Sequence, residues 1–213
     1  MTNFIPIFPL ALVVYPGEEL NLHIFEPRYK QLISDCYESK KNFGIPSVLN
    51  DKMADLGTLV EISEIVKTEE NGEMDIRTRG VKVFRVLETI QNVPEKLYSG
   101  AIVNYLGNDE MGNSELMQKV VSGIRKLHQL LNVTKNFTKP DEDLLSYDVA
   151  HHVGFSIDEE YELLGLTMEL QRQEYLRRHL TKVIPVVLEM EGLKEKIKLN
   201  GHFKNLTGFQ FNI

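Results

Sequence analysis

The sequence predicts an α+β protein in which an antiparallel β-barrel is followed by a helical bundle. Up to about residue 106, short segments rich in β-branched and aromatic residues alternate with turn residues, with one helical pattern among them. From Gly107 onward, apolar residues recur at steps of three and four, which is typical of amphipathic helices. We therefore expect a β-domain with one inserted helix at 1–106 and a helical domain at 107–213.

The β-domain is expected to consist of short strands around one tight hairpin. Asn71-Gly72 marks the hairpin, because both residues tolerate the positive φ angles of a two-residue turn. Gly80 is expected to interrupt the strand pattern after the turn. The strands are predicted at residues 4–15, 20–25, 42–49, 57–68, 74–78, 81–90 and 99–106.

The inserted helix begins at Pro27, a residue suited to the first turn because it has no N–H to leave unpaired. Apolar residues then follow at helical spacing, which predicts one buried face. The residues on that face are Tyr29, Leu32, Ile33, Cys36 and Tyr37.

The second half predicts several helices. One carries the apolar stripe between Leu116 and Leu131, and a second is expected at 141–153. Ser156 and Glu159 form a capping box for a short third helix that ends near Gly165. A fourth is expected from Thr167, with a break or kink at Pro185 and a last helix that stops at 200–201. The alternating tail 207–213 predicts a short strand, docked on this chain or on a neighbour.

Charge and composition exclude several classes of protein. The chain has 213 residues and a net charge of −7, with −4 on residues 1–106 and −3 on residues 107–213. Neither half has the basic balance of a nucleic-acid binder, so we expect no nucleic acid as partner. The N-terminus has neither a signal-peptide pattern nor a membrane span, and the single Cys36 cannot form an intrachain disulfide. We expect a cytoplasmic protein without membrane contact.

Two sequence blocks carry a family resemblance. The first runs from Ile5-Pro6-Ile7-Phe8-Pro9-Leu10 through Val14-Tyr15-Pro16-Gly17-Glu18 to Leu20-Asn21-Leu22-His23-Ile24-Phe25-Glu26-Pro27-Arg28-Tyr29. The second comprises Gly57-Thr58-Leu59-Val60-Glu61-Ile62, the Asn71-Gly72 hairpin and Arg79-Gly80-Val81-Lys82-Val83-Phe84-Arg85-Val86. Both blocks, in this order, resemble the N-terminal substrate-binding domain of Lon proteases. Val83 departs from the family, which often has arginine at that position.

The resemblance implies a PUA-like β-barrel, a helical bundle and recognition of polypeptides. No segment matches a phosphate-binding loop, and no serine–lysine protease motif is visible, so we expect a stand-alone member without ATPase and protease domains and without enzymatic activity. The expected partners are unfolded or peptide substrates and, as an adaptor or recruiter in protein quality control, a Lon-type protease. RNA binding, by analogy with other PUA-like barrels, and small-molecule binding remain the alternatives.

The candidate peptide-binding residues are the aromatic and charged residues around the strand-to-helix corner. Aromatic side chains supply most of the binding energy in interfaces, and a groove needs such anchors. The candidates are Tyr15, Phe25, Glu26, Arg28 and Tyr29. The competing interpretation is that Glu26 and Arg28 form a structural ion pair or a helix cap that fixes the strand-to-helix corner.

The sequence predicts no cofactor or metal site. Glycine-rich nucleotide loops are absent. His151 and His152 are adjacent, whereas metal-ligand pairs on helices usually lie four residues apart, so we interpret both as helix-surface residues. Cys36 lies on the apolar face of its helix and is expected to be buried rather than nucleophilic.

Overall fold

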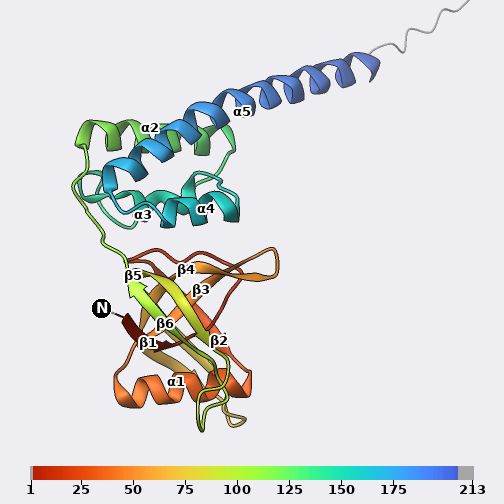
Figure 1. Ribbon diagram of the computed structural model, residues 1–213. Coiled ribbons are helices and arrows are strands. Elements are labelled where there is room, and N and C mark those ends of the chain that lie inside the picture. The colour runs from red at the N-terminus through yellow and green to blue at the C-terminus, as the bar shows by residue number, and fades with distance from the viewer. Residues whose placement is uncertain (1, 206–213) are drawn as a thin grey trace, which may run out of the picture.

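The computed structural model describes residues 2–205 of the chain, and side chains between residues 3 and 198. A layer of strands, with one helix at its far end, lies below a layer of helices, and the last helix runs out of the body (Figure 1). The expected order, an antiparallel β-sheet region followed by helices, is confirmed: the last strand ends at Tyr105 and the first helix of the second layer begins at Ser114.

All strand pairs in the sheet are antiparallel, in the order β1-β6-β5-β4-β3, with β2 pairing with β5 beside this path. The segment after β1 lies beside β3, where Phe8 N donates to Gly44 O over 2.8 Å, and so curls the sheet into a barrel. The strands are β1 (Thr2–Pro6), β2 (Glu19–Ile24), β3 (Phe43–Leu49), β4 (Lys52–Thr68), β5 (Met74–Ile90) and β6 (Gly100–Tyr105).

Two long strands replace shorter predicted ones. The hairpin at 71–72 is confirmed, with Gly72 at φ +78°, but β5 runs unbroken through Gly80. The prediction of an interruption at Gly80 was wrong. Gly80 instead allows the backbone at Tyr15 to pass close to β5, because a Cβ at position 80 would lie 2.1 Å from the Tyr15 carbonyl oxygen. Residues 52–56, which lie between two of the predicted strands, belong to β4, which begins at Lys52.

The inserted helix, α1 (Pro27–Ser39), closes the end of the barrel that lies away from the other helices (Figure 1). Its predicted face is buried at Tyr29, Leu32, Ile33 and Cys36. Tyr37 in the last turn is exposed, so its predicted burial was wrong.

The second layer contains α2 (Ser114–Leu130), α4 (Ile157–Leu164) and α5 (Glu169–Asn205), together with three short elements. The capping box of α4 is confirmed: the Ser156 side chain accepts from Glu159 N, and the Glu159 carboxylate accepts from Ser156 N. The helix predicted at 141–153 is split into η1 (Asp141–Asp143), α3 (Ser146–Val149) and η2 (Ala150–His152).

Side-chain acceptors at the start of α3, one of them distant in sequence, explain the split between η1 and α3. Leu145 N donates to the Asp148 carboxylate, and Ser146 N donates to the Glu169 carboxylate. These N–H groups are therefore paired with side chains rather than with the carbonyls of a preceding helical turn.

The final helix, α5, is continuous through Pro185, so the predicted break was wrong, as was the predicted stop at 200–201. Proline removes one helical hydrogen bond, but Ile184 and Val187 on either side of it both pack against the core and hold the helical course. Within residues 2–205, none of the helices combines the length and apolarity needed to span a bilayer. The predicted tail strand at 207–213 lies outside the described residues.

The barrel and the helices share one hydrophobic core. Val13, Tyr15, Leu56 and Val83 come from the barrel and belong to the same buried cluster as the inner faces of α2, α4 and α5. Two further clusters lie within the barrel, one of them beneath α1. The helices are thus fixed to one end of the barrel by apolar burial, which leaves the sides of the barrel for other contacts.

Candidate functional site

The five predicted site residues do not lie together on one surface. Tyr15 is fully buried where the barrel meets the helices. Its ring stacks on Tyr147 at 5.1 Å between centroids, and its hydroxyl donates to Glu160 O over 3.0 Å. Burial, with the carboxylates of Glu160 and Glu18 nearby, raises the pKa of Tyr15 far above its ordinary value. Tyr15 is placed to join the two layers rather than to contact a ligand.

The other four predicted residues lie at the corner between β2 and α1. Tyr29 is buried against Phe8, with ring centroids 3.9 Å apart. Arg28 pairs with the Glu26 carboxylate at 2.8 Å and lies over the Tyr29 ring at 4.5 Å. This geometry matches the competing interpretation of a structural ion pair. Phe25 is 57% exposed and is the one aromatic ring of the five that a ligand can reach.

Phe25 follows β2, which has one free edge within residues 2–205, because its only strand partner is β5. Gly80 N donates to Glu18 O, which fixes the hydrogen-bond register of β2 against β5. Because backbone groups alternate in an antiparallel pair, the N–H and C=O groups of residues 20, 22 and 24 point toward β5. The N–H and C=O groups of Glu19, Asn21 and His23 therefore point to the free edge. Such a row of backbone groups is a template for a further strand.

Beside this edge, the outer face of the sheet forms a shallow depression of about 370 Å³. Val66 of β4 is 53% exposed there, and the His23 ring stacks with Phe25 at 6.1 Å between centroids. We call this region the β2 edge surface, defined by Asn21, His23, Phe25, Val66 and Arg77.

Carboxylates surround the β2 edge surface. His23 Nδ1 lies 2.7 Å from Asp75 Oδ1, and its Nε2 lies 3.6 Å from Glu73. The hydrogen bond to Asp75 is the main cause that raises the pKa of His23. Arg77 pairs with Glu64 at 3.0 Å. Beside β2 itself, the carboxylates of Glu73 and Asp75 thus lie against His23, which disfavours acidic ligands.

A second depression, of about 400 Å³, lies between the barrel and the helices. Some polar groups in its wall pair with each other: Lys139 lies 2.7 Å from Asp148, and Asn108 donates to Glu110. Arg172, also in the wall, is only 1% exposed and is held by a buried network. The depression therefore has a polar wall, part of which is paired within the wall or held by the buried network.

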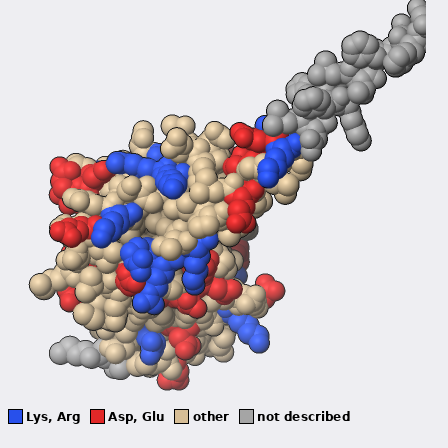
Figure 2. Space-filling view, turned by 90° about the horizontal axis from the view of Figure 1, so that it is seen from above, with Lys and Arg blue, Asp and Glu red and all other residues tan. Residues whose placement is uncertain are grey.

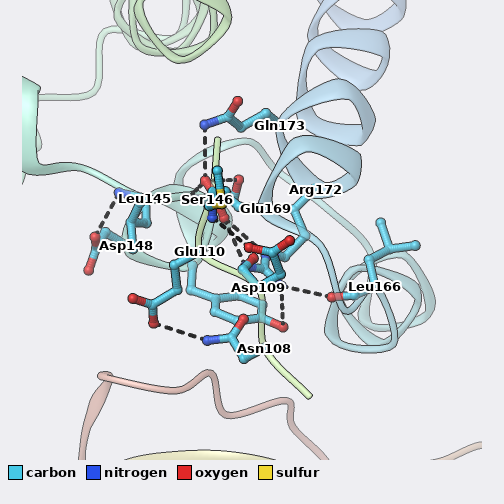
Figure 3. Close-up of polar contacts among 12 residues, drawn as sticks. Asn108, Asp109, Glu110, Leu145, Ser146, Asp148, Leu166, Glu169, Arg172 and Gln173 are labelled. Carbon is cyan, nitrogen blue, oxygen red and sulfur yellow. Dashed lines mark hydrogen bonds and ion pairs between the residues drawn. The ribbon is translucent and has the colours of Figure 1, made fainter. Parts of the chain in front are cut away.

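The buried network fixes the connection between the two layers (Figure 3). Glu169 accepts hydrogen bonds from Ser146 N and Oγ, both at 2.8 Å, and its other carboxylate oxygen pairs with Arg172 at 3.0 Å. Arg172 also donates to Leu166 O and Asp109 O, and it lies 4.3 Å over the Tyr147 ring. A buried ion pair is stable only when its remaining polar atoms are satisfied, as they are here.

His151 links the layers at the surface. Its Nδ1 lies 2.7 Å from Glu160 and its Nε2 lies 3.2 Å from Glu18, which belongs to the barrel region. Desolvation lowers the pKa of His151, but the hydrogen bonds to Glu160 and Glu18 outweigh it and raise the pKa to about 9. The ring is therefore a cation at neutral pH, held between two carboxylates.

The single thiol is buried, and no metal-binding cluster is found among the described residues. Cys36 is buried, and desolvation raises the pKa of its thiol to about 11, which disfavours the nucleophilic thiolate. In the part of the chain that the structure describes, no group of three or more His, Cys, Asp or Glu residues could hold a metal ion.

Sequence reasoning missed the edge residues and the buried network. The alternation of Leu20, Leu22 and Ile24 was a usable signal for a strand with one outer face. The spacing of Glu169 and Arg172, three residues apart, is common on exposed helix surfaces. Only the packed structure reveals that this pair is buried.

A family profile described as the substrate-binding domain of ATP-dependent protease La (Lon) matches residues 5–182. The chain belongs to this family. The match spans the barrel, the interface between the layers and the first part of α5.

Two solved structures share the fold of this Lon-family chain. The Lon N-terminal domain protein from Xanthomonas campestris has 24% sequence identity and a TM-score of 0.64, over 82% of this chain and 96% of that chain. The N-terminal domain of Lon protease from the Mycobacterium avium complex has 13% identity and a TM-score of 0.60, over 84% and 99%. At these identities the likeness concerns the fold alone.

Proposed function

We propose that the protein binds extended polypeptide segments along the β2 edge surface and does so without catalysis. Membership in the Lon substrate-binding family indicates a substrate-recognition module. The observation that carries the location is the free edge of β2, with outward backbone groups at Glu19, Asn21 and His23 next to the exposed Phe25. A peptide added as a strand gains main-chain hydrogen bonds from the edge and an anchor from the aromatic ring.

The chemistry of the surface suggests the class of segment that is bound. Main-chain pairing does not depend on side chains, so it suits a domain that handles many sequences. Phe25 offers apolar contact at the end of this edge, whereas the carboxylates of Glu73 and Asp75, which lie against His23, disfavour acidic ligands. We expect a preference for unfolded segments with alternating apolar and basic residues.

A backbone test separates strand addition from ordinary surface contact. Asn21→Pro removes one outward N–H, and proline is tolerated on an edge strand where that N–H faces solvent. Asn21→Ala keeps the N–H and is the matched control. We expect Asn21→Pro to weaken binding of a fluorescein-labelled unfolded casein at least about tenfold in Kd, or about 1.4 kcal/mol, by fluorescence anisotropy.

A side-chain test addresses the anchor. Phe25→Ala should weaken casein binding by about tenfold or more, because a central aromatic contact contributes roughly 2 kcal/mol. Leu87→Ala removes an equally exposed apolar side chain on the β6-paired half of β5 and is the control. Equal affinity of the wild type, Asn21→Pro and Phe25→Ala, all with native circular dichroism, would refute the location.

We further propose that the bound segments are clients of protein quality control and that the protein recruits them in the cytoplasm for a Lon-type protease. The family supports the client class, and a single buried thiol fits a reducing compartment. Co-purification of the Phe25→Ala variant from native cells should recover fewer unfolded clients than the wild type. Equal client recovery would argue against this role.

A further inference from the structure

The exposed end of α5 carries an apolar stripe that the described fold leaves uncovered. Val186, Met190, Leu193 and Ile197 are each between 55% and 62% exposed. Their spacing of four, three and four residues is the a/d spacing of a coiled coil, and at 100° per residue they lie within about 60° of the helix circumference. Figure 2 shows this end of the helix extending beyond the body, with acidic and basic side chains on it.

The stripe is distinct from the face that attaches α5 to the body. The attached face comprises Leu176, Leu180, Val183 and Val187, which belong to or pack against the shared core. It is centred about 80° around the helix from the stripe. A partner can therefore lie against the stripe without displacing the helix from its own body.

We propose that this stripe pairs with the same stripe of a second copy of the chain, as an antiparallel two-helix coiled coil. The register is two-fold symmetric: Val186 lies opposite Ile197 of the second copy, and Met190 lies opposite Leu193 of the second copy. Each a position thus meets a d position, as antiparallel packing of two such stripes requires. The pairing does not depend on the proposed function of the β2 edge surface.

Charge complementarity identifies a second copy as the occupant. In this register Glu189, which flanks the stripe, lies opposite Lys196 of the second copy, and the symmetry repeats the pair. The acidic residues Glu189 and Glu191 precede the lysines at 194, 196 and 198 along the helix, and Glu195 between those lysines lies on the side of the helix opposite the stripe, so the flanks of antiparallel helices match opposite charges. The antiparallel arrangement also opposes the two helix dipoles and keeps the two bodies at opposite ends.

The first experiment measures mass. Sedimentation velocity and light scattering on the full chain should give a dimer in equilibrium with monomer at about 1 to 100 µM, the range expected for a small interface. Leu193→Lys should shift the protein to monomer. Leu188→Lys, on the other side of the same helix, is the matched control and should leave the dimer in place. A wild-type monomer throughout this range would overturn the proposal.

The second experiment tests the register. Glu189→Lys places lysine opposite Lys196, and Lys196→Glu places glutamate opposite Glu189, so each variant alone should dimerise at least about tenfold more weakly. An equimolar mixture should restore the wild-type affinity, because both pairs in the mixed dimer again have opposite charges. In a parallel pair Glu189 would face Lys194, and mixing would leave a repulsive pair. Failure of the mixture to recover would overturn the antiparallel register.

The third experiment tests the competing occupant, the chain's own last residues. Deletion of 206–213 should leave the monomer–dimer equilibrium unchanged. A deleted chain that dimerises although the full chain is monomeric would show that the tail covers the stripe, and would refute pairing of two copies in the full-length protein.

Discussion

The two ends of α5 obey the same helical periodicity in opposite environments. Between Glu169 and Leu180 the helix buries an ion pair and leucine side chains inside the shared core. Between Val186 and Ile197 it presents side chains of similar size to solvent. The difference shows that an apolar stripe predicts a face that favours contact, but does not specify what makes the contact.

The comparison also separates two uses of charge on one helix. Glu169 and Arg172 are buried and tie α5 to α3 and to the segment that follows β6, whereas Glu174 is partly exposed and pairs with Arg177 and Arg178. The hydrogen bonds from Arg177 and Arg178 hold the pKa of Glu174 down to about 2. A buried charge that loses its partner lowers the stability of the fold strongly, whereas an ion pair in contact with water contributes little to stability.

The largest expected effect is the loss of one member of the buried pair. Glu169→Ala leaves Arg172 without its carboxylate inside the protein, and we expect a loss of about 3–5 kcal/mol in the free energy of unfolding. Urea unfolding followed by circular dichroism measures it. Glu174→Ala, at a partly exposed position of the same helix, should cost about 1 kcal/mol or less. Similar losses of unfolding free energy for Glu169→Ala and Glu174→Ala would show that burial of the Glu169–Arg172 pair does not increase its importance for stability.

The next largest effect is the difference in unfolding free energy lost when each of two leucines, eight residues apart on α5, is replaced by alanine. Leu180 is buried against α2 and the shared core, so Leu180→Ala should cost about 2–5 kcal/mol through the cavity it leaves. Leu188 is 42% exposed and lies off the proposed dimer stripe, so Leu188→Ala should cost about 0.5 kcal/mol or less. The same unfolding experiment measures both, and a large loss for Leu188→Ala would mean that this part of α5 is packed.

A smaller effect depends on pH and concerns the link between the layers. The folded pKa of His151, about 9, lies above its ordinary value of 6.5, so the charged ring stabilises the fold fully below about pH 6.5. This stabilisation is lost as pH rises through about 9. The difference in melting temperature between the wild type and His151→Gln should therefore shrink between pH 7 and 10. A difference that is constant over this range would exclude a charge effect.

The smallest effect is at Gly192, in the exposed part of α5. A Cβ at this position would meet no atom within 4 Å. Gly192→Ala should therefore stabilise the helix by about 0.5–1 kcal/mol through lower backbone entropy in the unfolded state. Circular dichroism at 222 nm during mild heating should show later fraying of α5. No change in fraying would indicate that this segment is held by contacts rather than by helix propensity.

Local sequence signals predicted the parts of the fold that depend on neighbouring residues. The hairpin turn at 71–72, the start of α1 at Pro27 and the capping box at Ser156 and Glu159 all follow from groups within a few residues of each other. The prediction of a break at Pro185 was wrong, because Ile184 and Val187 pack against the core, which is formed by residues distant in sequence, and these contacts keep α5 helical.

The candidate site was harder to predict for the same reason. Tyr15 and Phe25 are both aromatic residues of the first sequence block, and sequence alone treated them alike. Tyr15 is buried because the helical layer packs against it, and its hydroxyl donates to Glu160, which lies 145 residues further along the chain. Phe25 is exposed because nothing in the described chain covers the edge of β2.

By itself, the sequence determined the α+β order, the caps and turns, the apolar faces and the family resemblance, because each is carried by residues close together in the chain. Only the tertiary structure decided that Glu169 and Arg172 are buried, that β2 keeps a free edge and that half of α5 leaves the body. Burial depends on which segments meet, and free energy gained by long-range packing can override local preferences for breaks and strand ends.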